Sequence, residues 1–338
     1  MPTIRLGRTD LHLEKNAFGA LPIQRISQAD AVHLLRKAHD GGILYFDSAR
    51  SYTDSEEKVG AAFAGMRDQV VLATKTHSST PEEFWQHLHT SLTNLRTDCI
   101  DVYQFHNPDR CFRPGDGTGM YEAMLEARQQ GKIRFIGMTN HSYAVASEAA
   151  ESGLYDTLQF PFSYLAIERD QQLVRRCEEL DVGFVCMKGM SGGLIQNSRA
   201  AYAFVAQFAN ALPIWGMQHE NELDEFLSYV KNPPVLDDAL RAAIEKDRLE
   251  LCGKFCRGCG YCLPCPAGIN IPTAARIDLL TRRSALGRFR DEATQQLMAK
   301  VEDCINCRHC ADHCPYHLDT PQLLRDNLAA YRRYLAQA

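Results

Sequence analysis

Residues 70–106, VVLATKTHSSTPEEFWQHLHTSLTNLRTDCIDVYQFH, contain one strand–helix–strand unit. The runs VVLAT (70–74) and IDVYQF (100–105) are apolar and rich in residues that favour β-strands. Between them, Thr80-Pro81-Glu82-Glu83 supplies an N-cap residue, a first-turn proline and two acids, which is how many helices begin. The stretch therefore predicts two strands joined by a helix.

The same pattern repeats from about residue 16 to residue 230. The other apolar runs are ILYF (43–46), IRFIGM (133–138), LQF (158–160), GFVCM (183–187), PIW (213–215) and a weaker one near 17–23. Eight such units predict an α/β fold with a closed (β/α)8 TIM barrel. The alternative is an open doubly wound sheet, but no G-x-G-x-x-G follows the first strand. Residues 3–6 and 11–13 predict a short hairpin that caps the bottom of the barrel.

Eight of the 13 cysteines form two runs near the C-terminus. The second run has the spacing C-x2-C-x2-C-x3-C-P, which is the bacterial ferredoxin spacing for a [4Fe–4S] cluster. The two runs are Cys256, Cys259, Cys262, Cys265 and Cys304, Cys307, Cys310, Cys314. Structural zinc is the alternative, but the Cys-Pro end of each run favours iron–sulfur. Of the two possible cluster numbers, we favour two clusters over one. Cys252 is interpreted as a spare thiol.

In two-cluster ferredoxins, the fourth cysteine of one run serves the other cluster. We therefore predict that Cys314 completes the cluster of the upstream run, and that Cys265 completes the cluster of the downstream run. Helical segments at 273–281 and 291–301 separate the runs, which predicts a small, mainly α-helical ferredoxin-like domain.

Length and composition are those of a two-domain globular protein of 338 residues. We predict a barrel over 1–236, a linking helix over 237–251 and a cluster domain over 252–338. A net charge of −5 gives no basic footprint for nucleic acid. We expect no signal peptide and no membrane span. Unpaired cysteines then favour a reducing cytoplasm.

Polar residues fall where the predicted strands end, and in such barrels active sites gather at these ends. The set is Asp47, Lys75, His106, Thr139, Asn140, Gln159 and Lys188, with Tyr52 in the loop behind Asp47. Four of them suit the reduction of a carbonyl group. Tyr52 would donate the proton, Lys75 would ease its loss, Asp47 would hold Lys75, and His106 would orient the substrate oxygen.

Several stretches resemble the aldo-keto reductase family. Residues 47–56, DSARSYTDSE, are similar to its signature D-[TS]-A-x-x-Y-x-x-S-E. Residues 73–75 and 98–106 resemble its lysine motif and fourth strand, and 137–140 resemble its G-x-[ST]-N. The residues of its catalytic tetrad then correspond to Asp47, Tyr52, Lys75 and His106. The C-terminal cysteines resemble a subgroup with an appended 4Fe–4S domain.

The resemblance also implies a nicotinamide cofactor, NADPH or NADH. Thr139, Asn140 and Gln159 would hold the carboxamide, while Lys188, Ser191, Gly192 and Gly193 would approach the pyrophosphate. Gly216, Gln218 and the following helix start would meet the adenosine end. NADPH-using members often place a positive charge here, whereas this sequence has Glu220 and Glu222.

Three functions remain open from the sequence. The first is an NAD(P)-dependent oxidoreductase that interconverts a small-molecule carbonyl and alcohol, with clusters that exchange electrons with a partner protein. The second is the same reductase with structural or redox-sensing clusters. The third is a nucleotide-sensing module without turnover, which the intact tetrad disfavours.

Overall fold

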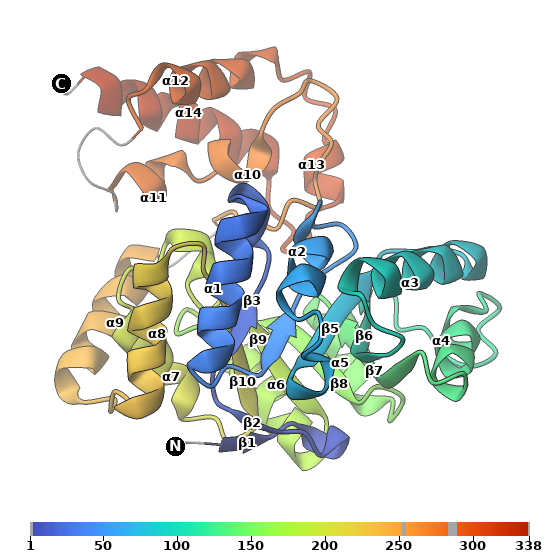
Figure 1. Ribbon diagram of the computed structural model, residues 1–338. Helices are drawn as coiled ribbons and strands as arrows, with labels where there is room; N and C mark the ends of the chain where they lie inside the picture. Colours follow the sequence, from blue (N-terminus) through green and yellow to red (C-terminus); the bar gives the residue numbers. More distant parts are fainter. Residues whose placement is uncertain (1–2, 252–254, 283–288, 337–338) are drawn as a thin grey trace. The chain divides into compact units, whose positions relative to one another are not determined.

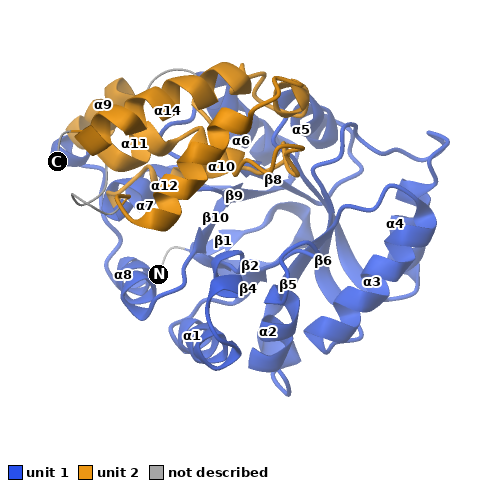
Figure 2. Cartoon of the chain, turned by 90° about the horizontal axis from the view of Figure 1, so that it is seen from above, with its two compact units in different colours: residues 1–189, 198–240 blue, residues 190–197, 241–338 orange. Residues whose placement is uncertain are grey.

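The computed structural model describes residues 3–251, 255–282 and 289–336 of the chain (Figure 1). Cys252 lies outside the described residues. The chain divides into two compact units, Met1–Gly189 with Ser198–Leu240, and Met190–Asn197 with Arg241–Ala338 (Figure 2). The predicted boundaries at 236 and 251 stay a prediction. Among the described residues, no helix is both long and apolar enough to cross a bilayer.

The first unit contains a closed barrel of eight parallel strands, as predicted (Figure 2). Each strand pairs with the next along the chain, and the last pairs with the first. The strands are β3 (Ala17–Gly19), β4 (Tyr45–Asp47), β5 (Val71–Thr76), β6 (Ile100–His106), β7 (Ile133–Thr139), β8 (Thr157–Pro161), β9 (Gly183–Met187) and β10 (Ala211–Gly216). Their apolar side chains are buried almost throughout, because both faces of the sheet are covered.

Helices alternate with the strands and surround the barrel (Figure 2). Two of them begin at caps that the sequence predicts: the Ser27 side chain accepts from the Asp30 amide, and the Thr80 side chain accepts from the Glu83 amide. The helices are α1 (Gln28–Asp40), α2 (Ser55–Ala62), α3 (Pro81–Leu95), α4 (Met120–Gln129), α5 (Tyr143–Glu151), α6 (Glu168–Glu179), α7 (Ser198–Ala206) and α8 (Glu220–Lys231).

A hairpin of β1 (Thr3–Arg5) and β2 (His12–Glu14) precedes the barrel, as predicted. Leu6 and Leu13 pack with inward side chains of the strands, so the hairpin closes the end of the barrel that lies opposite the active-site end. Gly7 has φ +52° and approaches the backbone at Gly183 so closely that a Cβ would lie 2.2 Å from its nitrogen. This position therefore requires glycine.

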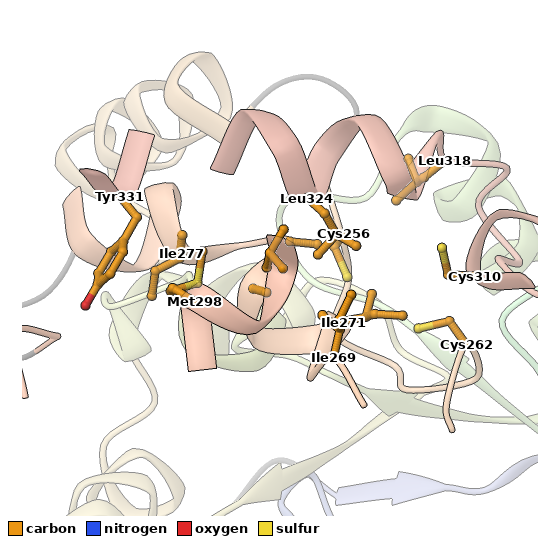
Figure 3. Close-up of a cluster of buried hydrophobic side chains, with 13 residues drawn as sticks. Cys256, Cys262, Ile269, Ile271, Ile277, Met298, Cys310, Leu318, Leu324 and Tyr331 are labelled. Atoms are coloured by element: carbon orange, nitrogen blue, oxygen red, sulfur yellow. The ribbon is translucent and has the colours of Figure 1, made fainter. Parts of the chain in front are cut away.

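The second unit is helical between its cysteines, as predicted. Helix α9 (Asp238–Leu251) begins in the first unit and ends in the second, whose further helices are α10 (Ile271–Ala274), α11 (Ile277–Arg282), α12 (Glu292–Ala299), α13 (His309–Asp312) and α14 (Thr320–Ala336). They enclose a separate apolar core that includes Ile271, Ile277, Leu324 and Tyr331 (Figure 3). Several cysteine side chains belong to this core, so any group that they bind is part of how the unit packs.

Candidate functional site

The strand register brings the predicted polar residues to one level of the barrel. Lys75 is paired with Gln104, His106 with Thr139, and Thr139 with Gln159. Asp47 ends β4 and is paired with Ala73, two residues before Lys75. These residues lie at the C-terminal ends of neighbouring parallel strands, where side chains converge.

A buried ion pair lies at the centre of this level. Lys75 Nζ lies 2.5 Å from Asp47 Oδ2 and donates to the Ser48 carbonyl oxygen at 2.5 Å. Both side chains are almost inaccessible, at 1% exposed for Lys75 and 3% for Asp47. Gln104 Nε2 donates to the other Asp47 oxygen at 3.2 Å. Asp47 is therefore fixed from two sides and in turn fixes the ammonium group.

Tyr52 and His106 lie next to this ion pair. The Lys75 ammonium is 5.3 Å from the centre of the Tyr52 ring. The Tyr52 and His106 rings meet edge to face with their centres 5.9 Å apart. Ser51 Oγ is 3.5 Å from His106 Nδ1. The structure thus brings all four predicted catalytic residues together.

The electrostatics of the four residues favour a neutral phenol and a neutral imidazole. Burial raises the pKa of Tyr52, and the Lys75 charge opposes that rise. Burial and the neighbouring charge of Lys75 lower the pKa of His106 to about 3. Burial also raises the pKa of Asp47, against the opposing effect of Lys75. Among the described residues, Asp47 is the one carboxylate that pairs with the Lys75 ammonium, at 2.5 Å, so the ionised form is the stable form of this pair.

We expect His106 to remain neutral down to about pH 4. Its folded pKa lies below the ordinary value of about 6.5. The unfolded chain therefore takes up this proton first, and the stability that neutral His106 contributes is lost as the pH falls from about 6.5 toward 3. Titration of the His106 ring signals by NMR, assigned with a His106→Gln variant, checks this. A midpoint near 6.5 would contradict it.

Sequence reasoning missed three polar residues beside the tetrad. Gln104 lies two residues before His106 on β6, and the period-two alternation of a strand puts both side chains on the same face. Burial lowers the pKa of His141, and the charge of Lys188 lowers it further. His77 contributes likewise to the low pKa of His106. Their positions next to predicted strand-end residues were the available signal.

Glu56, the last residue of the DSARSYTDSE stretch, is a buried structural centre. It is 1% exposed and accepts hydrogen bonds from Thr74 Oγ1 and Ser91 Oγ, both at 2.7 Å. Arg50 pairs with its other oxygen at 2.5 Å. The carboxylate thereby ties the loop that carries Tyr52 to β5 and α3.

The residues predicted to hold the carboxamide differ in which side-chain hydrogen-bonding groups they leave available to a ligand. Gln159 hydrogen-bonds Asp47, and this bond opposes the rise in the pKa of Asp47. The side-chain amide oxygen of Gln159, Oε1, is buried and has no partner within the described residues. Asn140 uses both ends of its amide inside the protein, with Pro108 and Ser142. Thr139 Oγ1 lies 3.9 Å from the Met187 sulfur. Gln159 therefore has an acceptor to offer a ligand, and Asn140 shapes the loop.

The predicted phosphate residues form a turn in which Lys188 and Ser191 have positive φ values of 60° and 48°. Gly192 and Gly193, with φ values of 65° and 90°, continue it. Lys188 belongs to the first compact unit, whereas Ser191, Gly192 and Gly193 belong to the second. Such a turn can present successive backbone amides to an anion.

The residues predicted to meet the adenosine end, Gly216 and Gln218, lie at the end of β10 and just before α8. Gly216 is exposed, and the side-chain amide oxygen of Gln218, Oε1, is buried with no partner within the described residues. Glu222 Oε2 accepts from the amides of Gln218 and His219 at 2.8 and 3.0 Å. A protein carboxylate thus already takes two of the donors that an anionic ligand would use.

In the second unit, four cysteines line one cavity. They are Cys265 from the upstream run and Cys304, Cys307 and Cys310 from the downstream run. The other lining residues are mostly apolar, such as Ile269, Ile271 and Leu324, together with Arg308 and His309, and no carboxylate of the described residues lines it. Thiolates in an apolar cradle are the donor set and surroundings of an iron–sulfur cluster.

The other four cysteines also lie near one another. The charges of Cys259 and Cys314 add to burial in raising the pKa of Cys256. Those of Cys256 and Cys259 do the same for Cys262, whose pKa rises to about 12. Cys262 and Cys310 lie at the same end of the apolar core (Figure 3). No His, Cys, Asp or Glu group within the described residues is placed to hold a single metal ion.

Comparison with known proteins identifies the class. The model of the aldo/keto reductase family matches residues 15–201, and that of the 4Fe-4S dicluster domain matches residues 255–319. The chain therefore belongs to the aldo/keto reductase family and carries a C-terminal region of the 4Fe–4S dicluster type.

Two of the similar curated proteins come from Bacillus subtilis. Aldo-keto reductase YhdN of Bacillus subtilis is 31% identical over 179 residues, which cover 49% of this chain and 53% of YhdN. Oxidoreductase YrpG of the same organism, described as uncharacterized, is 28% identical over 220 residues, covering 56% and 67%. The matches thus span about half to two thirds of these relatives.

Solved structures share the fold. Aldo-keto reductase AKR11C1 from Bacillus halodurans has a TM-score of 0.64 at 21% identity and covers 73% of this chain and 96% of its own. An aldo-keto reductase from Klebsiella pneumoniae, in complex with NADPH, has a TM-score of 0.62 at 21% identity, covering 72% and 94%. At this identity the likeness establishes the barrel alone.

Proposed function

We propose that this protein is a nicotinamide-dependent oxidoreductase that interconverts a small carbonyl compound and its alcohol. The observation that carries the proposal is the buried Lys75–Asp47 pair directly beneath the Tyr52 ring, with neutral His106 against the ring edge. The nicotinamide would supply the hydride, and every other contribution comes from side chains of the barrel.

In this proposal Tyr52 delivers the proton to the substrate oxygen. Its raised pKa keeps the phenol protonated at neutral pH. As the proton leaves, the fixed charge of Lys75 stabilises the phenolate, and Asp47 keeps that charge in place. His106, being neutral, can hydrogen-bond the substrate oxygen without competing for the proton.

The nicotinamide would be held by residues of the same barrel level. The unpaired Gln159 carbonyl oxygen can accept from a carboxamide N–H, because the Gln159 amide nitrogen is turned toward Asp47. Thr139 lies beside it in the register. Lys188 would provide positive charge for phosphate, and Gln218 has a buried oxygen to offer at the adenosine end. Ser191, Gly192 and Gly193 stay a prediction from the resemblance.

We expect NADH to bind about tenfold more tightly than NADPH, a difference of about 1.4 kcal/mol. Glu222 occupies two amides at the start of α8, and Glu220 pairs with Lys37 at 2.7 Å and lies 3.2 Å from His33. A 2′-phosphate would meet these carboxylates instead of unpaired cations. Nucleotide fluorescence titration measures both affinities.

The same titration tests the function as a whole. Glu222→Ala should reduce the preference for NADH over NADPH, because two amide donors become available to an anion. Glu126→Ala, which removes an exposed acid on α4, is the matched control and should change neither affinity. Failure of the native protein to bind either nucleotide would rule out the oxidoreductase.

We further propose that the cysteines hold two [4Fe–4S] clusters, which would exchange single electrons with a partner protein. The cavity lined by Cys265, Cys304, Cys307 and Cys310 supports one of them. The closeness of Cys259 and Cys314 to Cys256, which adds to burial in raising the pKa of Cys256, supports the other. Anaerobic purification should yield about eight iron atoms per chain; zinc in their place would refute the clusters.

A further inference from the structure

Arg276 lies beside the upstream cysteine run. It follows α10, and its side chain is half-buried. Its guanidinium packs against the backbone of Gly258, where a Cβ would lie 2.7 Å from Arg276 Cζ. The amide of that same Gly258 lies 3.3 Å from the Cys256 sulfur and donates to it. The guanidinium therefore contacts a glycine that is next to Cys259 and two residues after Cys256, both of which we assign to the first cluster.

Two carbonyl oxygens anchor the guanidinium. Arg276 Nε donates to Pro272 at 2.8 Å, and one terminal nitrogen donates to Gly192 at 3.2 Å. Gly192 belongs to the segment Met190–Asn197, which packs in this unit, and its positive φ of 65° turns it toward the arginine. The side chain thus ties the segment 190–197 to the end of α10, 84 positions away in the sequence.

The charge of Arg276 has no carboxylate partner among the described residues. Taking an ammonium or guanidinium out of water without an anion is costly, and arginines in proteins are normally paired when withdrawn from solvent. The thiol groups of Cys256 and Cys259 are the neighbours that could carry the opposing charge, once a bound cluster holds them as thiolates. A cluster held by four thiolates would supply this negative charge permanently.

We propose that Arg276 is a positioning residue that balances the charge of the first cluster and raises its reduction potential, while holding the 190–197 segment through Gly192. An added electron makes the cluster more negative, and a fixed cation beside it stabilises that form. The Gly258 amide, aimed at the Cys256 sulfur, acts in the same direction. This inference rests on the proposed cluster ligands Cys256, Cys259, Cys262 and Cys314.

The test is an anaerobic redox titration of the full chain, followed by visible absorption and electron paramagnetic resonance. In Arg276→Met, the equilibrium constant for reducing one cluster should fall about tenfold, which corresponds to about 59 mV for one electron. The other cluster should be unchanged. Arg276→Lys keeps the charge and should stay within about threefold of the native constant. Arg325→Met, which removes an exposed arginine on α14, is the matched control and should shift neither cluster.

Each result bears on the proposal. The proposal would be overturned if Arg276→Met kept the native equilibrium constants for reduction, or if Arg276→Met and Arg325→Met changed them equally. Should Arg276→Met fail to retain iron, retention by Arg276→Lys supports charge balance, whereas loss in both variants overturns it. Counting iron and sulfide in the native protein separates the role of Arg276 from the assignment of the cluster ligands. A native chain that holds no clusters refutes the ligand assignment, not the role of Arg276.

Discussion

Replacing Tyr52 with phenylalanine should lower kcat for a carbonyl substrate by about 10²–10⁴-fold, the range that general acid catalysis supplies. The change removes one hydroxyl and leaves the ring, which packs 5.3 Å from the Lys75 ammonium and against His106. Geometry and charge around the site should therefore persist. What is lost is the proton that must reach the substrate oxygen.

Two measurements separate this role from a structural one. Steady-state kinetics reports the loss in kcat, and nucleotide titration should show a cofactor affinity within about twofold of the native value, because uniform binding is untouched. Tyr45→Phe is the matched control. The Tyr45 hydroxyl is buried in the same barrel and has no hydrogen-bond partner within the described residues, so its removal should leave kcat unchanged.

Near-native turnover in Tyr52→Phe would remove Tyr52 from the role of acid. A different result, in which the native protein binds nucleotide but turns over no carbonyl compound, would favour the nucleotide-sensing alternative. In that case Tyr52→Phe should retain the full biological effect of the protein. The two outcomes are distinct, since the first requires measurable turnover and the second its absence.

The barrel and the tetrad could be predicted because both depend on local pattern. Each strand is an apolar run, and the polar residue that ends it lies at the same edge of the barrel as its neighbours. Once the strand order is known, the register follows, and His106, Thr139 and Gln159 are adjacent without further information.

The rest depends on contacts between distant segments. Glu56 looks like a solvated acid in the sequence, and only the packing of β5 and α3 reveals that Thr74 and Ser91 bind it. Gln104 stands inside a strand and not at its end, so a rule based on strand ends passes over it. The resemblance places Ser191, Gly192 and Gly193 near the pyrophosphate, but the hydrogen bond between Gly192 and Arg276 joins residues 84 positions apart, which no local pattern predicts.

Loss of Cys265 should remove the cluster of the downstream run, although Cys265 belongs to the upstream run. It lines the same cavity as Cys304, Cys307 and Cys310, and its charge helps to raise the pKa of Cys310. Cys314, at the end of the downstream run, instead acts on Cys256. Cys265→Ala and Cys314→Ala should therefore each lose about four of eight iron atoms, from opposite clusters.

Double variants decide which cysteines share a cluster. Cys265→Ala combined with Cys304→Ala should still retain about four iron atoms, because both ligands serve one cluster. Cys265→Ala combined with Cys256→Ala should retain almost none. The reverse pattern would show that each run closes its own cluster. Cys99→Ala, at a half-buried thiol of the barrel unit, controls for the loss of a cysteine as such and should keep all the iron. Since a ligand shared across the runs ties both loops together, losing either one should also destabilise the whole unit, measurable as a lower unfolding temperature.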